Sequence, residues 1–159
     1  RGFAAERRAP RPEPQLECHR EAIDRATDQH RVEDIVAALR AEAEHTPWLA
    51  AGLETLLRGC PTSARVILEQ YRRGRHLSLR ETFERELELS VQLTRRPDFA
   101  EGVRALLVDK DRNPRWQPAT LAEVSEEMVE ALFLPPAGLE GSALSGKETH
   151  AAGAPVVAA

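Results

Sequence analysis

The feature that most constrains the fold is a helical spacing of apolar residues that continues through most of the chain. Val32, Val36 and Leu39 lie three or four positions apart, which places them on one face of a helix. Comparable spacing recurs between residues 16 and 133. No segment shows the alternation of apolar and polar residues that marks a half-buried strand. The sequence therefore predicts a mainly α-helical structure.

Prolines and capping residues divide this stretch into separate helices. Thr46-Pro47 predicts an N-cap followed by a proline at the first helical position. Ser78 and Glu81 have the spacing of a capping box, in which each side chain bonds the backbone N–H of the other residue. Glu126 and Glu127 would stabilise the N-terminus of a last helix. The expected helices cover approximately residues 16–27, 32–43, 47–59, 61–74, 78–95, 97–107 and 125–133.

The segment after Pro97 carries the most specific packing predictions. Gly102 costs a helix about 1 kcal/mol relative to alanine, so we expect another helix to approach closely there. Residues 109–118 should be irregular, because they contain two prolines and an Asn-Pro step. Trp116 is expected to fill a pocket between the Pro97 helix and the Ser125 helix. Four apolar side chains are expected to face inward, namely Phe99, Val103, Leu106 and Leu107.

The two ends of the chain differ from the middle in composition. Residues 1–13 include the proline-rich run APRPEP, which predicts an extended lead-in. Residues 135–159 begin with two prolines and then contain few large apolar side chains, which predicts a disordered tail. The expected organisation is therefore a helical region over residues 14–134 with a non-helical segment on each side.

Composition and charge exclude several classes of function. A net charge of −4 gives no electrostatic reason to expect nucleic acid or an anionic membrane as a partner. No apolar run approaches the roughly 20 residues that a membrane-spanning helix needs. Cys18 and Cys60 are too few for a disulfide framework and lack zinc-site spacing, so we expect two reduced thiols.

No catalytic or metal-binding motif is recognisable in the sequence. Phosphate-binding glycine motifs, a GxSxG elbow and an HExxH pair are all absent. The histidines are too far apart in sequence to suggest a metal site, and no carboxylate stands out as a general base. An arginine-rich cluster is expected to be a solvated helix end, with an anion site for coenzyme A phosphates and a nucleic-acid contact as the alternatives. It comprises Arg65, Arg72, Arg73, Arg75, His76 and Arg80.

The string RPDFAEGVRALLVDKDRNPRW, residues 96–116, resembles the C-terminal signature of 3-hydroxyisobutyryl-CoA hydrolases, a branch of the crotonase (enoyl-CoA hydratase/isomerase) superfamily. The matching elements are Phe99, the EGVRA helix, the DKD turn, Pro114 and Trp116. Cys60-Pro61-Thr62-Ser63 is similar to the SPTS opening of the preceding helix in that branch. The resemblance extends over roughly residues 14–134.

This resemblance implies that the chain is the helical C-terminal portion of an α/β enzyme with the crotonase fold. Enzymes of the branch hydrolyse the thioester of a short 3-hydroxyacyl-CoA during valine breakdown. Their oxyanion-hole glycines and catalytic acids belong to the N-terminal half, so we expect no catalytic residue and no metal ligand in this chain. The chain alone is expected to be inactive. Coenzyme A is part of the substrate, so no separate cofactor is expected.

The resemblance also implies contacts and a location. In the wider superfamily a lysine beyond the EG helix approaches the adenosine end of coenzyme A, and here Lys110 falls one position late, which makes it a weak candidate for that contact. Leu106 stands where the superfamily has an aromatic residue. We expect an acyl-CoA substrate bound through the missing N-terminal half, a homo-oligomer, and a cytoplasmic location, or the mitochondrial matrix in a eukaryote. The alternatives are a sibling enoyl-CoA hydratase and a non-catalytic helical interaction module.

Overall fold

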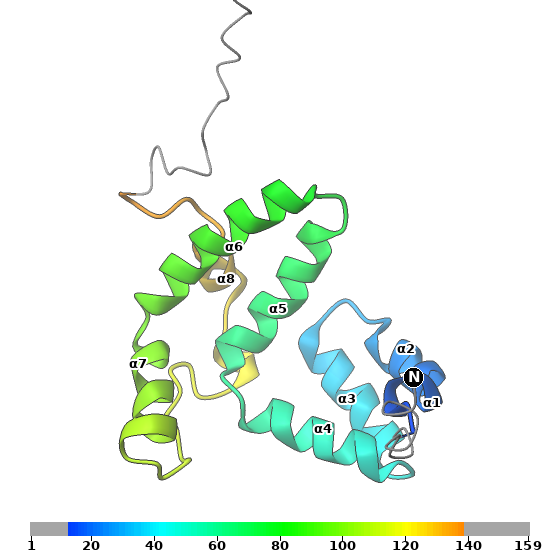
Figure 1. The fold of residues 1–159 in the computed structure, drawn as a ribbon. Helices are drawn as coiled ribbons and strands as arrows, with labels where there is room; N and C mark the ends of the chain where they lie inside the picture. Colours follow the sequence, from blue (N-terminus) through cyan, green and yellow to red (C-terminus); the bar gives the residue numbers. More distant parts are fainter. Residues whose placement is uncertain (1–12, 139–159) are drawn as a thin grey trace, which may run out of the picture. The chain divides into compact units, whose positions relative to one another are not determined.

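The computed structural model describes residues 13–138, and within them it contains helices and no β-strand (Figure 1). The prediction of a mainly α-helical structure is confirmed for this range. The chain forms two compact units, and the division falls inside helix α5. Unit 1 comprises the described residues up to Leu68 and Pro118–Glu123, and unit 2 comprises Glu69–Gln117 and the described residues from Val124 onward. The predicted segments 1–13 and 135–159 lie largely outside the described residues.

Unit 1 is built around helix α3, which packs against α2 and α4. Its buried core is formed by Val32, Val36 and Leu53, and Leu121 packs on it. The helical spacing of apolar residues in the 32–43 segment therefore reflects a buried face, as predicted. The elements of unit 1 are α1 (Gln15–Cys18), α2 (Arg20–Thr27), α3 (Val32–Ala43), α4 (Pro47–Arg58), the first part of α5 (Pro61–Gly74) and the short 3-10 helix η2 (Leu121–Glu123).

Polar contacts hold η2 onto unit 1. The guanidinium of Arg65 forms an ion pair with Glu33 of α3 and donates a hydrogen bond to the backbone carbonyl of Leu121 at 3.3 Å. The Arg65 side chain is only 15% exposed, and both of its bonds are to groups within unit 1. This arginine of the basic cluster is thus a structural residue of unit 1.

Two details of unit 1 differ from the sequence predictions. The expected helix at residues 16–27 is divided at His19, whose ring stacks on Trp48 with a centroid separation of 5.2 Å. Helix α4 begins at Pro47 as expected, but the Thr46 side chain makes no capping hydrogen bond. Proline at the first helical position has no N–H to satisfy and already has a helical φ, so the helix starts without that bond.

Unit 2 contains the second part of α5 together with α6, α7 and α8. Helix α6 contacts both α7 and α8. The predicted capping box of α6 is confirmed: the Ser78 backbone N–H donates to Glu81 Oε2 at 2.7 Å, and the Glu81 N–H donates to Ser78 Oγ at 3.3 Å. The elements are α6 (Leu79–Thr94), α7 (Pro97–Val103), the π-helix η1 (Arg104–Val108) and α8 (Glu126–Leu132), and the buried apolar residues are Leu89, Ala105, Val124, Val129 and Leu132.

Arg73 connects the end of α5 to α8 inside unit 2. Its guanidinium lies 4.2 Å from the centroid of the Phe133 ring, and its Nε donates to Glu69 Oε1 at 2.6 Å. It also forms an ion pair with Glu130. The Arg73 guanidinium therefore makes a cation–π contact and pairs with two carboxylates, and these contacts hold α5 and α8 together. Like Arg65, this arginine has a structural role.

The predicted inward face of the Pro97 helix is wrong for three of its four residues. Phe99, Leu106 and Leu107 are 54%, 60% and 62% exposed, whereas Ala105 is buried. For Leu106 and Leu107 the physical reason is the change from α-helix to π-helix at Arg104, where the Asp109 N–H donates to the Arg104 carbonyl five residues back at 2.8 Å. A π-turn holds more residues than an α-turn, so positions after Arg104 do not keep the 3.6-residue phase that the prediction assumed.

Candidate functional site

Residues 104–116 of the motif string form the π-helix η1 and then a closed turn. This whole segment is called the 104–116 turn. The chain leaves the π-helix at Val108, and the Arg112 N–H then donates to the Ala105 carbonyl at 3.0 Å. Residues 110–116 have no regular secondary structure, as the prolines and the Asn-Pro step predicted. A π-turn within a helix is rare and often occurs at functional sites. This turn is therefore a candidate functional site.

Arg104 is the centre of the turn. Its Nε and Nη2 bind the two carboxylate oxygens of Glu101 at 2.9 and 2.7 Å. Its Nη1 binds Asp109 Oδ2 at 2.6 Å and Asp111 Oδ2 at 2.7 Å. Nη2 also donates to the backbone carbonyl of Asn113 at 3.2 Å. One guanidinium therefore connects the helix to both acidic residues of the DKD sequence and to the segment beyond it.

These contacts determine the protonation of the carboxylates. The bidentate bond from Arg104, followed by the backbone N–H of Arg115 at 2.7 Å, lowers the pKa of Glu101 to about 2. Arg104 and the Asn113 N–H also lower the pKa of Asp111. A general base works best when its pKa lies near the operating pH. Glu101 is therefore a structural anion, poorly suited to accept a proton.

Two cationic residues stand at the tip of the turn in a left-handed backbone conformation. Lys110 has a φ of 58° and Arg112 a φ of 53°, and both are exposed. Non-glycine residues in this region cost roughly 1–2 kcal/mol each, and such strain is concentrated at functional sites. The hydrogen bonds from Arg104 to Asp109 and Asp111, the residues on either side of Lys110, offset the cost of this backbone conformation. The geometry presents cations at the surface, which suits an anionic ligand.

The segment beyond the tip packs back onto α7. The predicted close approach at Gly102 is found, but its partner is the Trp116 indole, not a helix. A Cβ added at Gly102 would lie 3.3 Å from Trp116 Cη2. The buried carboxylate of Asp98 accepts a hydrogen bond from the Gln117 N–H at 2.8 Å. A hollow of about 490 Å3 lies beside these contacts, lined by Pro97, Asp98, Ala100, Glu101, Arg104, Arg115 and Gln117.

The residues that the sequence analysis singled out have different environments in the structure. Lys110 lies at the exposed tip of the turn, while Arg65 and Arg73 of the basic cluster are engaged in packing contacts. Sequence reasoning missed Arg104 as the organising residue. The available signal was its spacing of three from Glu101, which suits a helical ion pair. Among the described residues, no group of three or more histidine, cysteine, aspartate or glutamate side chains is placed to hold a metal ion.

Within residues 13–138, none of the helices is both long enough and apolar enough to cross a bilayer. The cationic tip of the 104–116 turn, formed by Lys110 and Arg112, is the candidate site. It can contribute binding of an anion, since its carboxylates are held by guanidinium and amide groups.

Comparison with known proteins identifies the family. Residues 1–133 match the model of the enoyl-CoA hydratase/isomerase family. The chain is 41% identical over 120 residues to the mitochondrial 3-hydroxyisobutyryl-CoA hydrolase of Gallus gallus, a match that covers 76% of this chain and 31% of that protein. It is 38% identical over 111 residues to the small ribosomal subunit protein mS47 of Neurospora crassa, covering 65% of this chain and 22% of that protein.

A solved structure agrees with these relatives. The crystal structure of a carnitinyl-CoA dehydratase from Mycobacterium thermoresistibile is similar with a TM-score of 0.72 and 38% identity, covering 82% of this chain and 37% of that one. This chain spans about a third of the length of the curated relatives that it matches, as in the 31% for the Gallus gallus protein. The resemblance inferred from the EGVRA and DKD strings is confirmed. The chain belongs to the enoyl-CoA hydratase/isomerase family, and its sequence is similar to that of the 3-hydroxyisobutyryl-CoA hydrolases.

Proposed function

We propose that this chain is the C-terminal helical portion of an acyl-CoA thioester hydrolase, with 3-hydroxyisobutyryl-CoA as its substrate. The catalytic residues would belong to a preceding crotonase core, and this portion would cover that core and contribute a contact to coenzyme A. Coenzyme A would enter as part of the substrate, so no separate cofactor is needed. By analogy with the relatives named mitochondrial, the enzyme would act in the mitochondrial matrix in a eukaryote and in the cytoplasm otherwise.

The observation that carries this proposal is the apolar surface around the end of α7 and the π-helix. Leu106, Leu107 and Val108 are 60%, 62% and 68% exposed, and Phe99 lies exposed nearby in sequence. A contiguous run of large apolar side chains facing solvent usually marks a surface that another protein part covers. The share of the relatives' length that this chain matches is about one third, which leaves room for such a part.

The first test compares this chain with the product of its genomic reading frame. DNA upstream of the Arg1 codon should encode a crotonase core in frame, and an intergenic gap there would contradict the proposal. The longer protein should release free coenzyme A from 3-hydroxyisobutyryl-CoA, followed with a thiol reagent. The 159-residue chain alone should not exceed the buffer rate, because it would lack an oxyanion hole, of which each donor contributes roughly 3 kcal/mol. Turnover by the chain alone that persists after repurification would contradict the proposal.

The same assay distinguishes the hydrolase from a sibling hydratase. A hydratase adds water across the double bond of an enoyl-CoA and leaves the thioester intact, so no free thiol appears. We therefore expect thiol release with 3-hydroxyisobutyryl-CoA and little consumption of an enoyl-CoA. The reverse result would assign the chain to the hydratase alternative.

Lys110 is proposed as a coenzyme A contact of this enzyme, because it is exposed at a turn whose backbone is held by Arg104. In the longer protein, Lys110→Ala should raise KM for the acyl-CoA roughly threefold to fivefold and leave kcat unchanged, as expected for one exposed charge pair. A thioester of pantetheine, which lacks the adenosine and phosphate groups, should show no such rise. Arg58→Ala is the control, because Arg58 pairs with Glu54 on α4. An unchanged KM for the acyl-CoA would remove Lys110 from the binding site.

A second candidate function is a non-catalytic assembly role, favoured by the similarity to a protein named as a ribosomal subunit component. Such a protein would keep the helical packing and lose thioester hydrolysis. A longer protein that folds but releases no thiol from any short acyl-CoA would support this candidate over the hydrolase.

A further inference from the structure

The acidic residues of the DKD sequence do not neutralise the cations beside them. Both carboxylates are bound by Arg104, whose Nη1 lies 2.6 Å from Asp109 Oδ2 and 2.7 Å from Asp111 Oδ2. Among the described residues, the exposed side chains of Lys110 and Arg112 form no hydrogen bond or ion pair. The contacts of Arg104 therefore leave two cations at the tip of the turn ready for an anion from outside this part of the chain.

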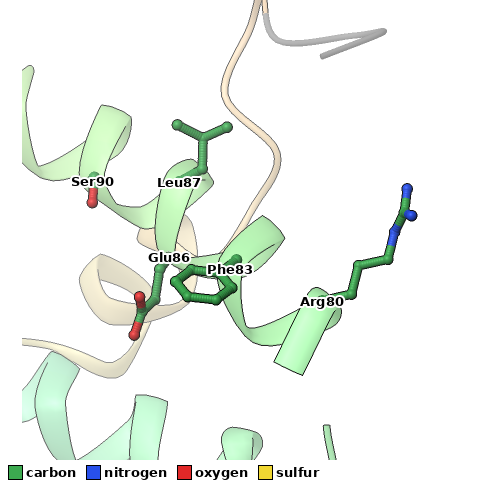
Figure 2. A pocket seen from close by; sticks show the side chains of 5 residues that line it. All are labelled: Arg80, Phe83, Glu86, Leu87 and Ser90. Atoms are coloured by element: carbon green, nitrogen blue, oxygen red, sulfur yellow. The ribbon is translucent and has the colours of Figure 1, made fainter. Parts of the chain in front are cut away.

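An exposed arginine on helix α6 shows the contrasting arrangement. Arg80 lines a surface hollow of about 480 Å3, and Figure 2 shows its side chain extending away from the Phe83 ring. Its Nε donates to Glu84 Oε1, one turn along the same helix, at 3.0 Å. An arginine with a carboxylate partner must share or give up that partner in order to bind an anion. Arg112 has no such cost.

The backbone that carries the two cations is held in a conformation that favours glycine. Lys110 and Arg112 have φ angles of 58° and 53°, which glycine adopts without steric cost. The Arg112 N–H donates to the Ala105 carbonyl at 3.0 Å, and the Asn113 N–H donates to Asp111 Oδ1 at 2.9 Å. The two Cα atoms lie at most about 7.6 Å apart, because two steps of 3.8 Å separate them. Long cationic side chains on such a backbone indicate that their charges are used.

We propose that Arg112 is a specificity-determining residue that binds, together with Lys110, a single phosphate monoester, and that Arg104 positions both cations. The inference rests on the proposed function for the identity of this group, which is then the 3′-phosphate of coenzyme A. A phosphate monoester carries a charge of roughly −1.5 to −2 at pH 7, which two cations match. The planar guanidinium of Arg112 can donate to two of its oxygens, and the ammonium group of Lys110 can donate to the third.

The first experiment measures binding to the 159-residue chain and needs no catalysis. Coenzyme A and dephospho-coenzyme A, which differ only in the 3′-phosphate, are titrated under reducing conditions and followed by amide chemical shifts. Coenzyme A should bind roughly tenfold more tightly, as expected for two exposed charge pairs. Arg112→Gly, which keeps the left-handed backbone, should weaken binding of coenzyme A roughly threefold to fivefold and leave dephospho-coenzyme A unchanged. Arg112→Lys should be intermediate, and the paired arginine variant Arg80→Ala should change neither affinity.

The positioning role of Arg104 is tested by rescue. Arg104→Met releases Asp109 and Asp111 beside the two cations, so binding of coenzyme A should weaken at least as much as in Arg112→Gly. Adding Asp109→Asn and Asp111→Asn to Arg104→Met should restore most of the affinity, because the competing carboxylates are then neutral. A residue that only stabilised the fold would not be rescued in this way. Circular dichroism of every variant checks that helix content is unchanged.

Kinetics of the longer protein separate this inference from the proposed function. Arg112→Gly should raise KM for 3-hydroxyisobutyryl-CoA roughly threefold to fivefold with kcat unchanged, and should not raise KM for the corresponding dephospho-coenzyme A thioester. A longer protein that cleaves no thioester, while the chain still distinguishes coenzyme A from dephospho-coenzyme A through Arg112, refutes the proposed function and supports the phosphate site. An original chain that does not distinguish the two ligands, or an Arg112→Gly variant that distinguishes them as well as the original, overturns the inference even in an active hydrolase.

Discussion

Replacing Trp116 with alanine should lower the free energy of unfolding by about 3 kcal/mol, the lower end of the range for a large aromatic side chain, because this indole is half-buried. The indole lies on Gly102 and holds the end of the 104–116 turn against α7. Denaturant unfolding followed by circular dichroism measures the loss. Trp48→Ala is the control, since Trp48 is 37% exposed and stacks on His19. A Trp116→Ala effect no larger than that of Trp48→Ala would contradict a structural role.

A double-mutant cycle isolates the contact between Trp116 and Gly102. Gly102→Ala alone should change stability little, because the gain of about 1 kcal/mol in helix propensity is offset by a Cβ that lies 3.3 Å from the indole. Once Trp116 is alanine, the same glycine substitution should stabilise the chain by about 1 kcal/mol. Equal effects in both backgrounds would mean that the two residues are not coupled. In the longer enzyme, turnover per folded molecule should be unchanged by Trp116→Ala, and a tenfold fall would place the residue at the substrate.

Removing the guanidinium at the centre of the turn should have the largest electrostatic effect. Arg104→Met leaves Glu101, Asp109 and Asp111 without their shared cation, so the pKa of Glu101 should rise from about 2 toward its ordinary value of 4.5. Carbon NMR of the glutamate carboxyl group against pH measures the shift directly. Arg58→Met, which breaks one exposed pair with Glu54, should leave the titration of Glu101 unchanged. A Glu101 pKa that stays near 2 in Arg104→Met would show that the N–H of Arg115 alone holds the carboxylate.

The same contact predicts an acid dependence of stability. The pKa of Glu101 is lower in the folded chain than in the unfolded chain, so its contribution is fully present above about pH 4.5 and is lost as the pH falls toward 2. Asp111, whose pKa is also lowered, adds to the loss in the same direction. Unfolding free energies of the original chain should therefore fall over this window, and Arg104→Met should flatten the slope. Parallel slopes in the two proteins would contradict this assignment.

Most of the helical framework was predictable because its signals are local. Proline at a first helical position, a capping box and a 3.6-residue apolar period depend on residues within a few positions of one another. The Ser78–Glu81 box and the start of α5 at Pro61 are therefore found where the sequence placed them. The family was predictable for a similar reason, since the EGVRA and DKD strings are contiguous.

The candidate site was predictable only in part. Lys110 could be marked from the resemblance, but the role of Arg104 depends on contacts to residues from 101 to 113 that meet only after the chain has turned back. Gly102 signalled a close approach, yet a missing Cβ does not say which group approaches. Trp116 occupies that space because residues 110–116 fold back onto α7.

Sequence alone determined most of the helix starts, the family and the absence of a recognisable catalytic motif, because each depends on residue order. Tertiary structure decided which sides of the helices are buried. The π-turn at Arg104 changes the phase of every side chain after it, so Leu106 and Leu107 face solvent and Ala105 is buried. That turn is stable because Arg104 forms charge-assisted hydrogen bonds to Glu101, Asp109 and Asp111 at once. The helix propensities of the individual residues do not include the free energy of these bonds.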